Sequence, residues 1–259
     1  MNTATAMSSP LNGLVSAFKK LIQYKPLTEK KSAEAYDLWA GNYDAQPGNL
    51  MLDMDEEIFG KLLAEVNIKG KQVADIGCGT GRHWPKLYAG KPASLTGFDI
   101  SAGMLHRLEQ KFPEAKTHQI TDNLFKDIPD AAYDVVISTL TVAHIENLEE
   151  ALGAWCRMAK PKADMIITDF HPNALAHGGK RTFKYDGGSI SIQNFVHYVY
   201  DIEQILQSHG FRLATKLQKT VDESVKHYYE AQNALHVYEK FKDMRIIYGI
   251  HLTRGYDIE

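Results

Sequence analysis

The sequence is poor in cysteine. Cys78 and Cys156 are the only two in 259 residues, and no Cys-x-x-Cys pair occurs. Two cysteines are too few for the disulfide framework of a small secreted protein. We therefore expect a protein of the reducing cytoplasm.

Long hydrophobic runs and targeting signals are also lacking. No apolar run approaches the roughly 18 residues that a membrane-spanning helix needs. The N-terminus lacks the basic start and long apolar core of a signal peptide, and residues 1–40 contain no arginine, which disfavours a transit peptide. No stable membrane insertion is expected.

A strong excess of either charge is missing as well. The 29 basic and 32 acidic residues leave a net charge of −3, so nucleic acid is not an expected partner. Hydrophobic residues make up 44% and charged residues 24%, which excludes a mainly disordered or fibrous protein. The chain is an ordinary globular protein whose length lies between one domain and two.

The middle of the chain alternates short apolar runs with segments of helical spacing. Runs of this kind are typical of strands buried on both faces, and the alternation predicts an α/β fold with a doubly wound, mostly parallel sheet. The runs lie at residues 73–76, 95–98, 135–137 and 165–167. Ser101 is expected to cap one intervening helix, and Asp53 with Glu56 to form a capping box at the start of another.

The ends of the chain follow other patterns. Helical spacing predicts an amphipathic helix over residues 11–22 and a second helix over 31–40. The triplet 186–188, Asp-Gly-Gly, lies between short strand-like segments and predicts a β-hairpin. Further strands are expected at 211–217 and 246–252.

A glycine-rich turn carries the strongest functional signal. Residues 73–81 read Val-Ala-Asp-Ile-Gly-Cys-Gly-Thr-Gly, directly after a predicted strand. Asp99 ends the next strand, 20 residues beyond Gly79, where a carboxylate can accept hydrogen bonds from the two hydroxyls of a ribose. The alternative is a tight strand–helix turn with no ligand. We favour a nucleoside site.

The spacing of this turn distinguishes between nucleosides. A dinucleotide site favours G-x-G-x-x-G, but Arg82 occupies the position of the final glycine. Asp75, close to the turn, suits a cationic group better than a diphosphate. S-adenosylmethionine (SAM) has a ribose, an amino group and no phosphate, so it fits this pattern better.

At this point the sequence resembles the class I SAM-dependent methyltransferases. Residues 73–83 resemble the first motif of that family, and residues 97–105 its second. The pair Asp122 and Asn123 matches an acidic position before the fourth-strand motif, which residues 133–147 resemble. An N-terminal element of the family is matched by Tyr36, Tyr43 and Asp44.

The resemblance implies SAM as cofactor and assigns roles to individual residues. Asp99 would bind the ribose hydroxyls, and Tyr43 would close over the carboxylate end of the cofactor. The methionine part would be held by Asp75 and by the glycine turn, in particular Gly77, Cys78, Gly79 and Gly81.

The resemblance assigns further residues to the adenine ring and to the reactive methyl group. Ile100 and Met104 would enclose the adenine ring, and Asp122 with Asn123 would contact its edge. Ser138 and Thr139 would lie near the methyl group, at the end of the fourth strand of the family. The resemblance also implies a seven-stranded sheet whose last strand is antiparallel.

Three histidines follow predicted strands or the hairpin and are candidates for a general base. His144 is the first choice, and His171 and His197 follow. Each could equally serve as a loop cap. Metal ligands could be supplied by Asp169, His171 and Asn173, and also by His144. No recognised metal-ligand spacing is present, so no metal is predicted.

The whole chain, 1–259, is expected to form a single domain. Residues 1–50 would form an N-terminal helical lid, 70–170 the SAM-binding core, and 171–200 a hairpin insert over the acceptor. Residues 201–259 would add helices and strands that complete the sheet.

The sequence thus predicts a SAM-dependent methyltransferase that acts by in-line displacement on a small-molecule acceptor, at oxygen or nitrogen rather than carbon. The alternatives are an RNA or protein methyltransferase, a SAM-binding protein without turnover, and a nicotinamide-dependent oxidoreductase. A homodimer is left open.

Overall fold

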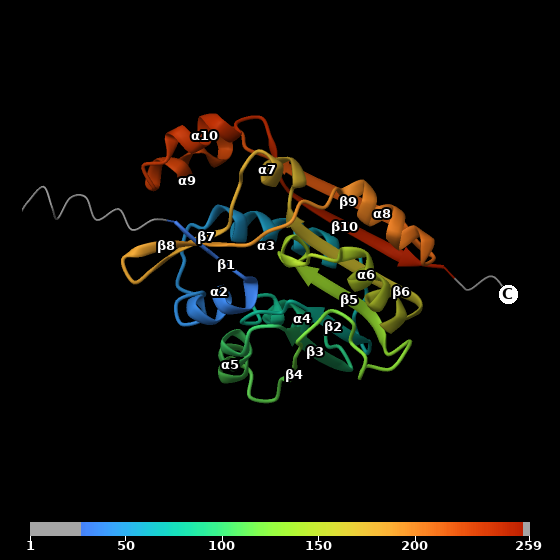
Figure 1. The fold of residues 1–259 in the computed structure, drawn as a ribbon. Helices are drawn as coiled ribbons and strands as arrows, with labels where there is room; N and C mark the ends of the chain where they lie inside the picture. Colours follow the sequence, from blue (N-terminus) through green and yellow to red (C-terminus); the bar gives the residue numbers. More distant parts are fainter. Residues whose placement is uncertain (1–26, 256–259) are drawn as a thin grey trace, which may run out of the picture.

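The computed structural model describes residues 27–255, so the helix predicted over 11–22 lies outside the described residues. A seven-stranded sheet of order β4-β3-β2-β5-β6-β10-β9 forms the centre (Figure 1). Neighbouring strands are parallel except at β10, which is antiparallel to both β6 and β9. The predicted fold class is confirmed. The strands are β2 (Gln72–Ile76), β3 (Ser94–Asp99), β4 (Lys116–Gln119), β5 (Tyr133–Thr139), β6 (Ala159–Phe170), β9 (Phe211–Thr220) and β10 (Arg245–Arg254).

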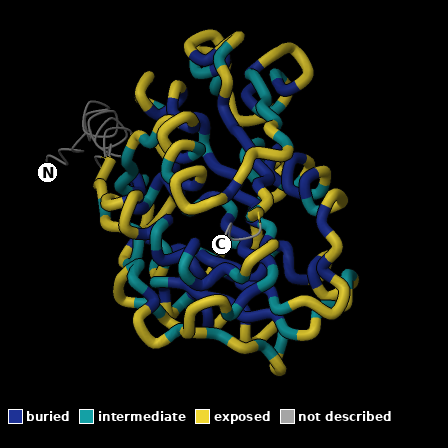
Figure 2. The backbone as a smooth tube through the Cα atoms, turned by 90° about the vertical axis from the view of Figure 1, so that its right-hand side faces the viewer, coloured by how far each residue is buried: buried dark blue, intermediate teal, exposed yellow. Residues whose placement is uncertain are grey.

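Both faces of the sheet are covered because successive side chains of a strand point to opposite faces. In β2, Ala74 and Ile76 pack with one apolar cluster, whereas Val73 packs with another. The first face is covered by α6 (Leu148–Met158) and α8 (Val199–Ser208). The second is covered by α3 (Leu50–Leu63), α4 (Trp84–Ala89) and α5 (Ala102–Lys111). Figure 2 shows the buried strands in the interior and exposed segments around them.

Side-chain caps decide where two of these helices begin. Ser101 accepts a hydrogen bond from the backbone N–H of Met104 at 3.1 Å, so the predicted cap of α5 is confirmed. The capping box predicted at Asp53 is wrong. The side chain of Asn49 instead accepts from two backbone N–H groups of the first turn, and α3 begins at Leu50. Asp53 lies inside the helix and accepts from the hydroxyl of Tyr228 at 2.7 Å.

One edge strand, β4, has no counterpart among the apolar runs of the sequence. It pairs in parallel with β3 through residues 116–119, and three of its four side chains are exposed. An edge strand with polar, exposed side chains has no apolar run, so hydrophobic patterning does not detect it.

A small second sheet, of order β1-β8-β7, includes the predicted hairpin. β7 (Thr182–Tyr185) and β8 (Gly188–Ile192) are antiparallel, and the turn residues Asp186 and Gly187 both have positive φ, as a tight hairpin turn requires. β1 (Thr28–Lys30) pairs in parallel with β8, which the sequence did not indicate.

The N-terminal segment packs on this hairpin. α2 (Ser32–Trp39) lies against it, and the ring of Trp39 stacks on Phe183 with ring centroids 4.5 Å apart. Ala35, Ile190 and Ile192 complete a separate apolar cluster. The start of the described chain and the hairpin therefore form one packed unit, named here the cap unit (residues 27–44 and 182–192).

The remaining short elements connect these parts. They are the 3₁₀ turns η1 (Val142–His144) and η2 (Glu223–Val225) and the helices α7 (Pro172–Ala176), α9 (Lys226–Ala231) and α10 (Leu235–Phe241). Over residues 27–255, every helix is too short or too polar to cross a membrane.

Candidate functional site

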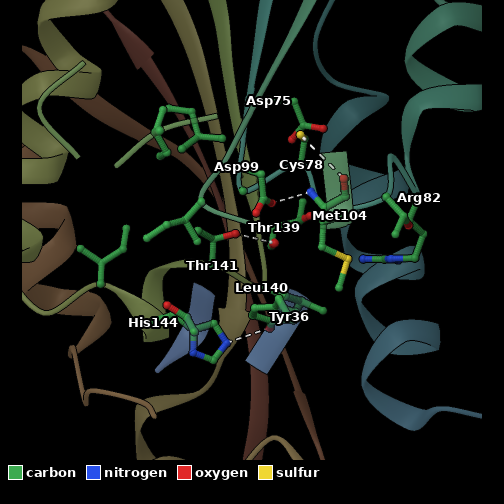
Figure 3. Close-up of a pocket in the computed structure, with 18 of the residues that line it drawn as sticks. Tyr36, Asp75, Cys78, Arg82, Asp99, Met104, Thr139, Leu140, Thr141 and His144 are labelled. Carbon is green, nitrogen blue, oxygen red and sulfur yellow. Dashed lines mark hydrogen bonds between the residues drawn. The ribbon is translucent and has the colours of Figure 1, made fainter. Parts of the chain in front are cut away.

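A cavity of about 890 Å³, counting the space at its mouth, lies at the carboxyl ends of β2, β3 and β5 (Figure 3). This edge of a parallel sheet is where α/β proteins bind ligands. The cap unit contributes Ser32, Tyr36 and Tyr43 to the wall. The cavity is therefore bounded by the sheet on one side and by the cap unit on the other.

The glycine-rich turn forms the floor of the cavity, and its glycines have different tasks. A Cβ atom on Gly77 would lie 1.9 Å from Oγ1 of Thr141, so only glycine fits there. Gly79, at φ +53°, faces open space and leaves its backbone accessible. Gly81 lies outside the cavity, and a Cβ there would press on Leu108 and Trp84. The side chain of Cys78 also lines the cavity.

Asp99 lies at the tip of β3, held by two backbone amides. The N–H groups of Gly79 and Ser101 each donate to one carboxylate oxygen at 2.8 Å. Burial raises the pKa of Asp99 to about 6, although these hydrogen bonds lower it. Each oxygen keeps a lone pair for a further donor, as binding of a ribose through both hydroxyls requires.

A second buried carboxylate, Asp75, lies in the same cavity. Its Oδ2 accepts a hydrogen bond from the indole N–H of Trp84 at 2.8 Å. Burial raises the pKa of Asp75 to about 6, and the charge of Asp99 raises it further. Two carboxylates near one another disfavour a diphosphate and favour a ligand with positive charge.

The predicted adenine contacts are only partly brought together. Ile100, Met104 and Asn123 line the cavity. Asp122 does not: it is exposed, and its Oδ1 accepts from the backbone N–H of Leu124 at 2.9 Å. The Asp122 carboxylate is engaged in a short turn, so the structure does not support the predicted contact of Asp122 with adenine.

The predicted position of Ser138 near the methyl group is not supported either. Its side chain is buried and lies outside the cavity wall, which is formed there by residues 139–141. Leu140 has a positive φ of 53°, a backbone strain of the kind that concentrates at functional sites. Of the two predicted residues, Thr139 lines the cavity and Ser138 does not, and the turn after β5 also presents Thr141 to it.

Tyr36 and His144 meet across the cavity (Figure 3). The hydroxyl of Tyr36 lies 3.0 Å from Nε2 of His144, and Nδ1 of the same ring lies 2.9 Å from the carbonyl oxygen of Gln193. A carbonyl only accepts, so Nδ1 carries the proton and Nε2 accepts from Tyr36. Burial lowers the pKa of His144 to about 4 and raises that of Tyr36. The imidazole is neutral at pH 7.

The other two candidate histidines do not reach this site. Nδ1 of His171 accepts from the backbone N–H of Asn173 at 3.2 Å, which caps α7. Nε2 of His197 lies 2.6 Å from the carbonyl oxygen of Ile145. Neither lines the cavity, so the structure does not support either as the base: each imidazole has a backbone partner elsewhere.

The sequence did not indicate a charged network that lies beneath the glycine turn. Buried Asp55 of α3 pairs with Arg82 and accepts from Nε2 of His83 at 2.9 Å and from Thr168 of β6. Burial alone would raise the pKa of Asp55, but these partners lower it to about 2. Because its partners are far apart in sequence, no local motif indicates this network, which joins α3 to the turn.

Metal-ligating side chains are not gathered in threes or more anywhere in the described part of the chain. The polar groups that line the cavity are instead carboxylates, hydroxyls, backbone amides, two imidazoles, the Arg82 guanidinium and the Asn123 amide. Such a set can bind a nucleoside and orient a small acceptor.

Comparison with known proteins shows what the part of the chain around this cavity is similar to. Residues 74–167 match a family model described as a methyltransferase domain. A malonyl-[acyl-carrier protein] O-methyltransferase of Serratia marcescens is 28% identical over 156 residues, which cover 60% of this chain and 58% of that protein. The chain thus spans little more than half the length of this curated relative.

Solved structures agree on the fold. A structure described as a putative S-adenosylmethionine-dependent methyltransferase from Listeria monocytogenes matches with a TM-score of 0.60 at 17% identity, over 77% of this chain and 99% of that one. The [4+2]-cyclase SpnF matches with a TM-score of 0.63 at 15% identity, over 90% and 100%. These likenesses show the Rossmann-like fold alone. With the matched family model, the chain resembles the class I SAM-dependent methyltransferases over residues 74–167.

Proposed function

We propose that the protein binds SAM in the cavity and transfers its methyl group to an oxygen atom of a small-molecule acceptor. One observation carries the proposal: the buried carboxylates Asp75 and Asp99 share a cavity with a neutral His144 that accepts a hydrogen bond from Tyr36. The two carboxylates suit the cofactor, and the pair of His144 and Tyr36 suits an acceptor that must lose a proton.

The residues present fit the cofactor. Gly79 leaves open space beside Asp99, whose two oxygens can accept from ribose hydroxyls. Asp75 offers negative charge for an amino group, and Ile100 with Met104 offers apolar contact for an adenine. Bound there, SAM would supply an electrophilic methyl group on a sulfonium.

The protein's own part in the transfer is positioning and proton transfer. An in-line displacement depends mainly on holding the two reacting atoms in line and close together. Nε2 of His144 can take up the proton of an acceptor hydroxyl, either directly or through the hydroxyl of Tyr36. The carbonyl oxygen of Gln193 fixes the ring orientation and would stabilise the protonated form.

Closure over the acceptor is part of the proposal. We infer that the cap unit, with residues 45–50 and the segment 171–200, forms the lid, and that residues 70–170 bind the cofactor. The part of the predicted lid before residue 27 lies outside the described residues. Support comes from the apolar cluster that joins the hairpin to α2 and to Met104 of α5. A cytoplasmic setting is also inferred, supported by the two free, buried cysteines.

An oxygen acceptor is preferred to a nitrogen one because a neutral hydroxyl needs a base, which the cavity offers. The O-methyltransferase named above supports this choice. The fold also hosts a protein titled a cyclase, so fold alone does not establish methyl transfer.

Calorimetry with S-adenosylhomocysteine tests the cofactor half. The wild type should bind, and Asp99→Ala should weaken binding at least about 100-fold, because hydrogen bonds to a charged group contribute about 1.5–3 kcal/mol each. Asp130→Ala is the control, since Asp130 is exposed and pairs with Arg157. No binding by the wild type at high micromolar concentration would refute the proposal.

Acceptor turnover is a separate measurement. Hydroxylated and carboxylated compounds incubated with SAM and the protein should show the gain of one methyl group by mass spectrometry. Binding of the cofactor without any methylated product across such a panel would instead favour a SAM-binding protein without turnover.

A further inference from the structure

Arg181 is a buried cation that forms no ion pair with any carboxylate of the described residues. It lies between α7 and β7 and is only 7% exposed. Its Nη2 donates to the hydroxyl of Tyr43 at 2.9 Å, and its Nε finds no acceptor among the described residues. No ion pair within residues 27–255 includes it.

Aromatic rings surround the guanidinium group instead. Its central carbon lies 5.2 Å from the ring centroid of Trp39 and 5.7–5.9 Å from those of Tyr36, Tyr43 and Phe170. The face of an aromatic ring attracts a cation. It does not accept hydrogen bonds from the guanidinium N–H groups, which point outward in the plane of that group. Most of the hydrogen-bonding capacity of Arg181 is left unused.

The charges of the buried carboxylates Asp169 and Asp55 help to raise the pKa of Arg181, but neither forms an ion pair or a hydrogen bond with it. Asp169 is engaged by backbone amides: Ala143 donates to one oxygen at 2.7 Å and Phe170 to the other at 2.6 Å. Asp55 is held by Arg82 and His83 in the network beneath the glycine turn.

Such an arrangement is costly unless an anion completes it. Arginine stays protonated at all ordinary pH values, and a buried charge is stable only when it is paired and hydrogen-bonded. Two of the surrounding residues, Tyr36 and Tyr43, also line the cavity. Arg181 itself does not line the cavity, but its guanidinium lies against the rings of these two tyrosines. An anion bound at this wall of the cavity is the partner that we infer.

We propose that the Arg181 guanidinium and the Tyr43 hydroxyl form a carboxylate-binding subsite of the cavity, an inference that rests on the proposed function. The planar fork of one arginine matches the two oxygens of a carboxylate. A phosphate dianion is disfavoured because Asp75 and Asp99 line the same cavity.

Two carboxylates could occupy this subsite: that of the methionine part of SAM, or one carried by the acceptor. The position of Arg181 favours the acceptor. It belongs to the segment that leads into the hairpin, and Tyr36 lies between it and His144. An acceptor anchored here by a carboxylate would be held within reach of the proposed base.

The anion site is tested first without cofactor. Thermal unfolding is followed for wild type, Arg181→Met and Lys180→Met, in sodium malonate and in sodium chloride of matched ionic strength. Malonate should raise the melting temperature of wild type and of Lys180→Met but not of Arg181→Met. Lys180 is the matched control because it is the adjacent, exposed cation and pairs with Glu29.

The source of the carboxylate is tested by calorimetry. S-Adenosylhomocysteine carries the carboxylate, whereas methylthioadenosine lacks the whole amino-acid part. If the subsite serves the acceptor, Arg181→Met binds both compounds as wild type does. If it serves the cofactor, Arg181→Met weakens binding of S-adenosylhomocysteine alone, by about 10- to 100-fold for lost hydrogen bonds to a charged group.

Two results overturn different claims. If folded Arg181→Met retains both the malonate effect and wild-type affinity for S-adenosylhomocysteine, the subsite does not exist. If the wild type binds no S-adenosylhomocysteine, the proposed function fails, and the malonate measurement still decides whether Arg181 binds a carboxylate.

Discussion

The Tyr36 hydroxyl and the His144 imidazole are joined by a 3.0 Å hydrogen bond across the cavity, and the donor in that bond is the tyrosine. The direction follows from the Gln193 carbonyl oxygen on the opposite side of the ring, which requires the proton on Nδ1. The pair therefore presents a neutral, proton-accepting nitrogen at the boundary between the sheet and the cap unit.

Replacement of this histidine should slow turnover far more than it weakens cofactor binding. For His144→Gln we expect methyl transfer to fall by about 10²–10⁴-fold, the usual contribution of a general base. The affinity for S-adenosylhomocysteine should stay within about twofold. His197→Gln is the matched control, since His197 lies outside the cavity. Equal losses in the two variants would contradict a role for His144 as base.

The pH profile of turnover gives an independent check. Burial lowers the pKa of His144 to about 4, so its base form persists over the whole neutral range. With cofactor and acceptor saturating, the rate should not fall near pH 6.5, where an ordinary histidine takes up a proton. A fall centred at pH 6.5 that disappears in His144→Gln would show that the ring titrates normally.

Cofactor affinity should depend on pH in a different range. Burial raises the pKa values of Asp75 and Asp99 to about 6, so both are ionised above that pH and neutral below it. A cationic ligand favours the ionised forms, and its affinity should fall as pH drops from 7 to 5. Calorimetry with SAM at constant ionic strength measures this, and a constant affinity over that range would refute it.

Close packing at Gly77 predicts that alanine destabilises the protein more there than at Gly48. Gly77→Ala places a Cβ 1.9 Å from Thr141 Oγ1 and adds the strain of a positive φ. Gly48 has a similar φ of +70° but open space around it. Gly48→Ala should therefore cost about 1–2 kcal/mol from backbone strain alone, whereas Gly77→Ala adds about 1–3 kcal/mol of overpacking.

Chemical denaturation measures the difference, and cofactor binding gives a second readout. Only Gly77→Ala should weaken S-adenosylhomocysteine binding, because it displaces the turn after β5. Gly77→Ala with Thr141→Ala should recover part of the lost stability. Equal destabilisation by the two single substitutions would show that close packing at Gly77 is unimportant.

The sequence predicts those features of the fold and the site that a short, local pattern of residues encodes. The glycine turn, Asp99 and the hairpin turn at Asp186 each come from a short pattern with a backbone or spacing requirement, and the structure contains all three. His144 was likewise found from its place after a strand.

The parts that sequence reasoning missed are relationships between distant segments. Arg181 has no special sequence neighbours, and its setting arises only when α2 and the end of β6 meet beside it. Asp55 likewise lies on an ordinary helix until Arg82 and His83 fold against it. Asp122 illustrates the reverse: its position along the chain fits a motif, but a local turn takes its carboxylate.

A last prediction concerns stability rather than the site. His251 of β10 lies 2.8 Å from a carboxylate oxygen of Asp164 and 3.2 Å from one of Glu65. The hydrogen bond to Asp164 is the main reason that the pKa of His251 is raised above 6.5. A histidine whose pKa is raised by folding binds its proton more tightly in the native state, so it stabilises the fold at low pH.

This contribution should be fully present below pH 6.5 and disappear as pH rises through the raised pKa. His251→Gln should therefore lower the free energy of unfolding more at pH 6 than at pH 9, as urea denaturation at the two values measures. His236→Gln provides the control, because His236 is exposed on α10, away from β10. A pH-independent difference between wild type and His251→Gln would mean that the ring contributes only through packing.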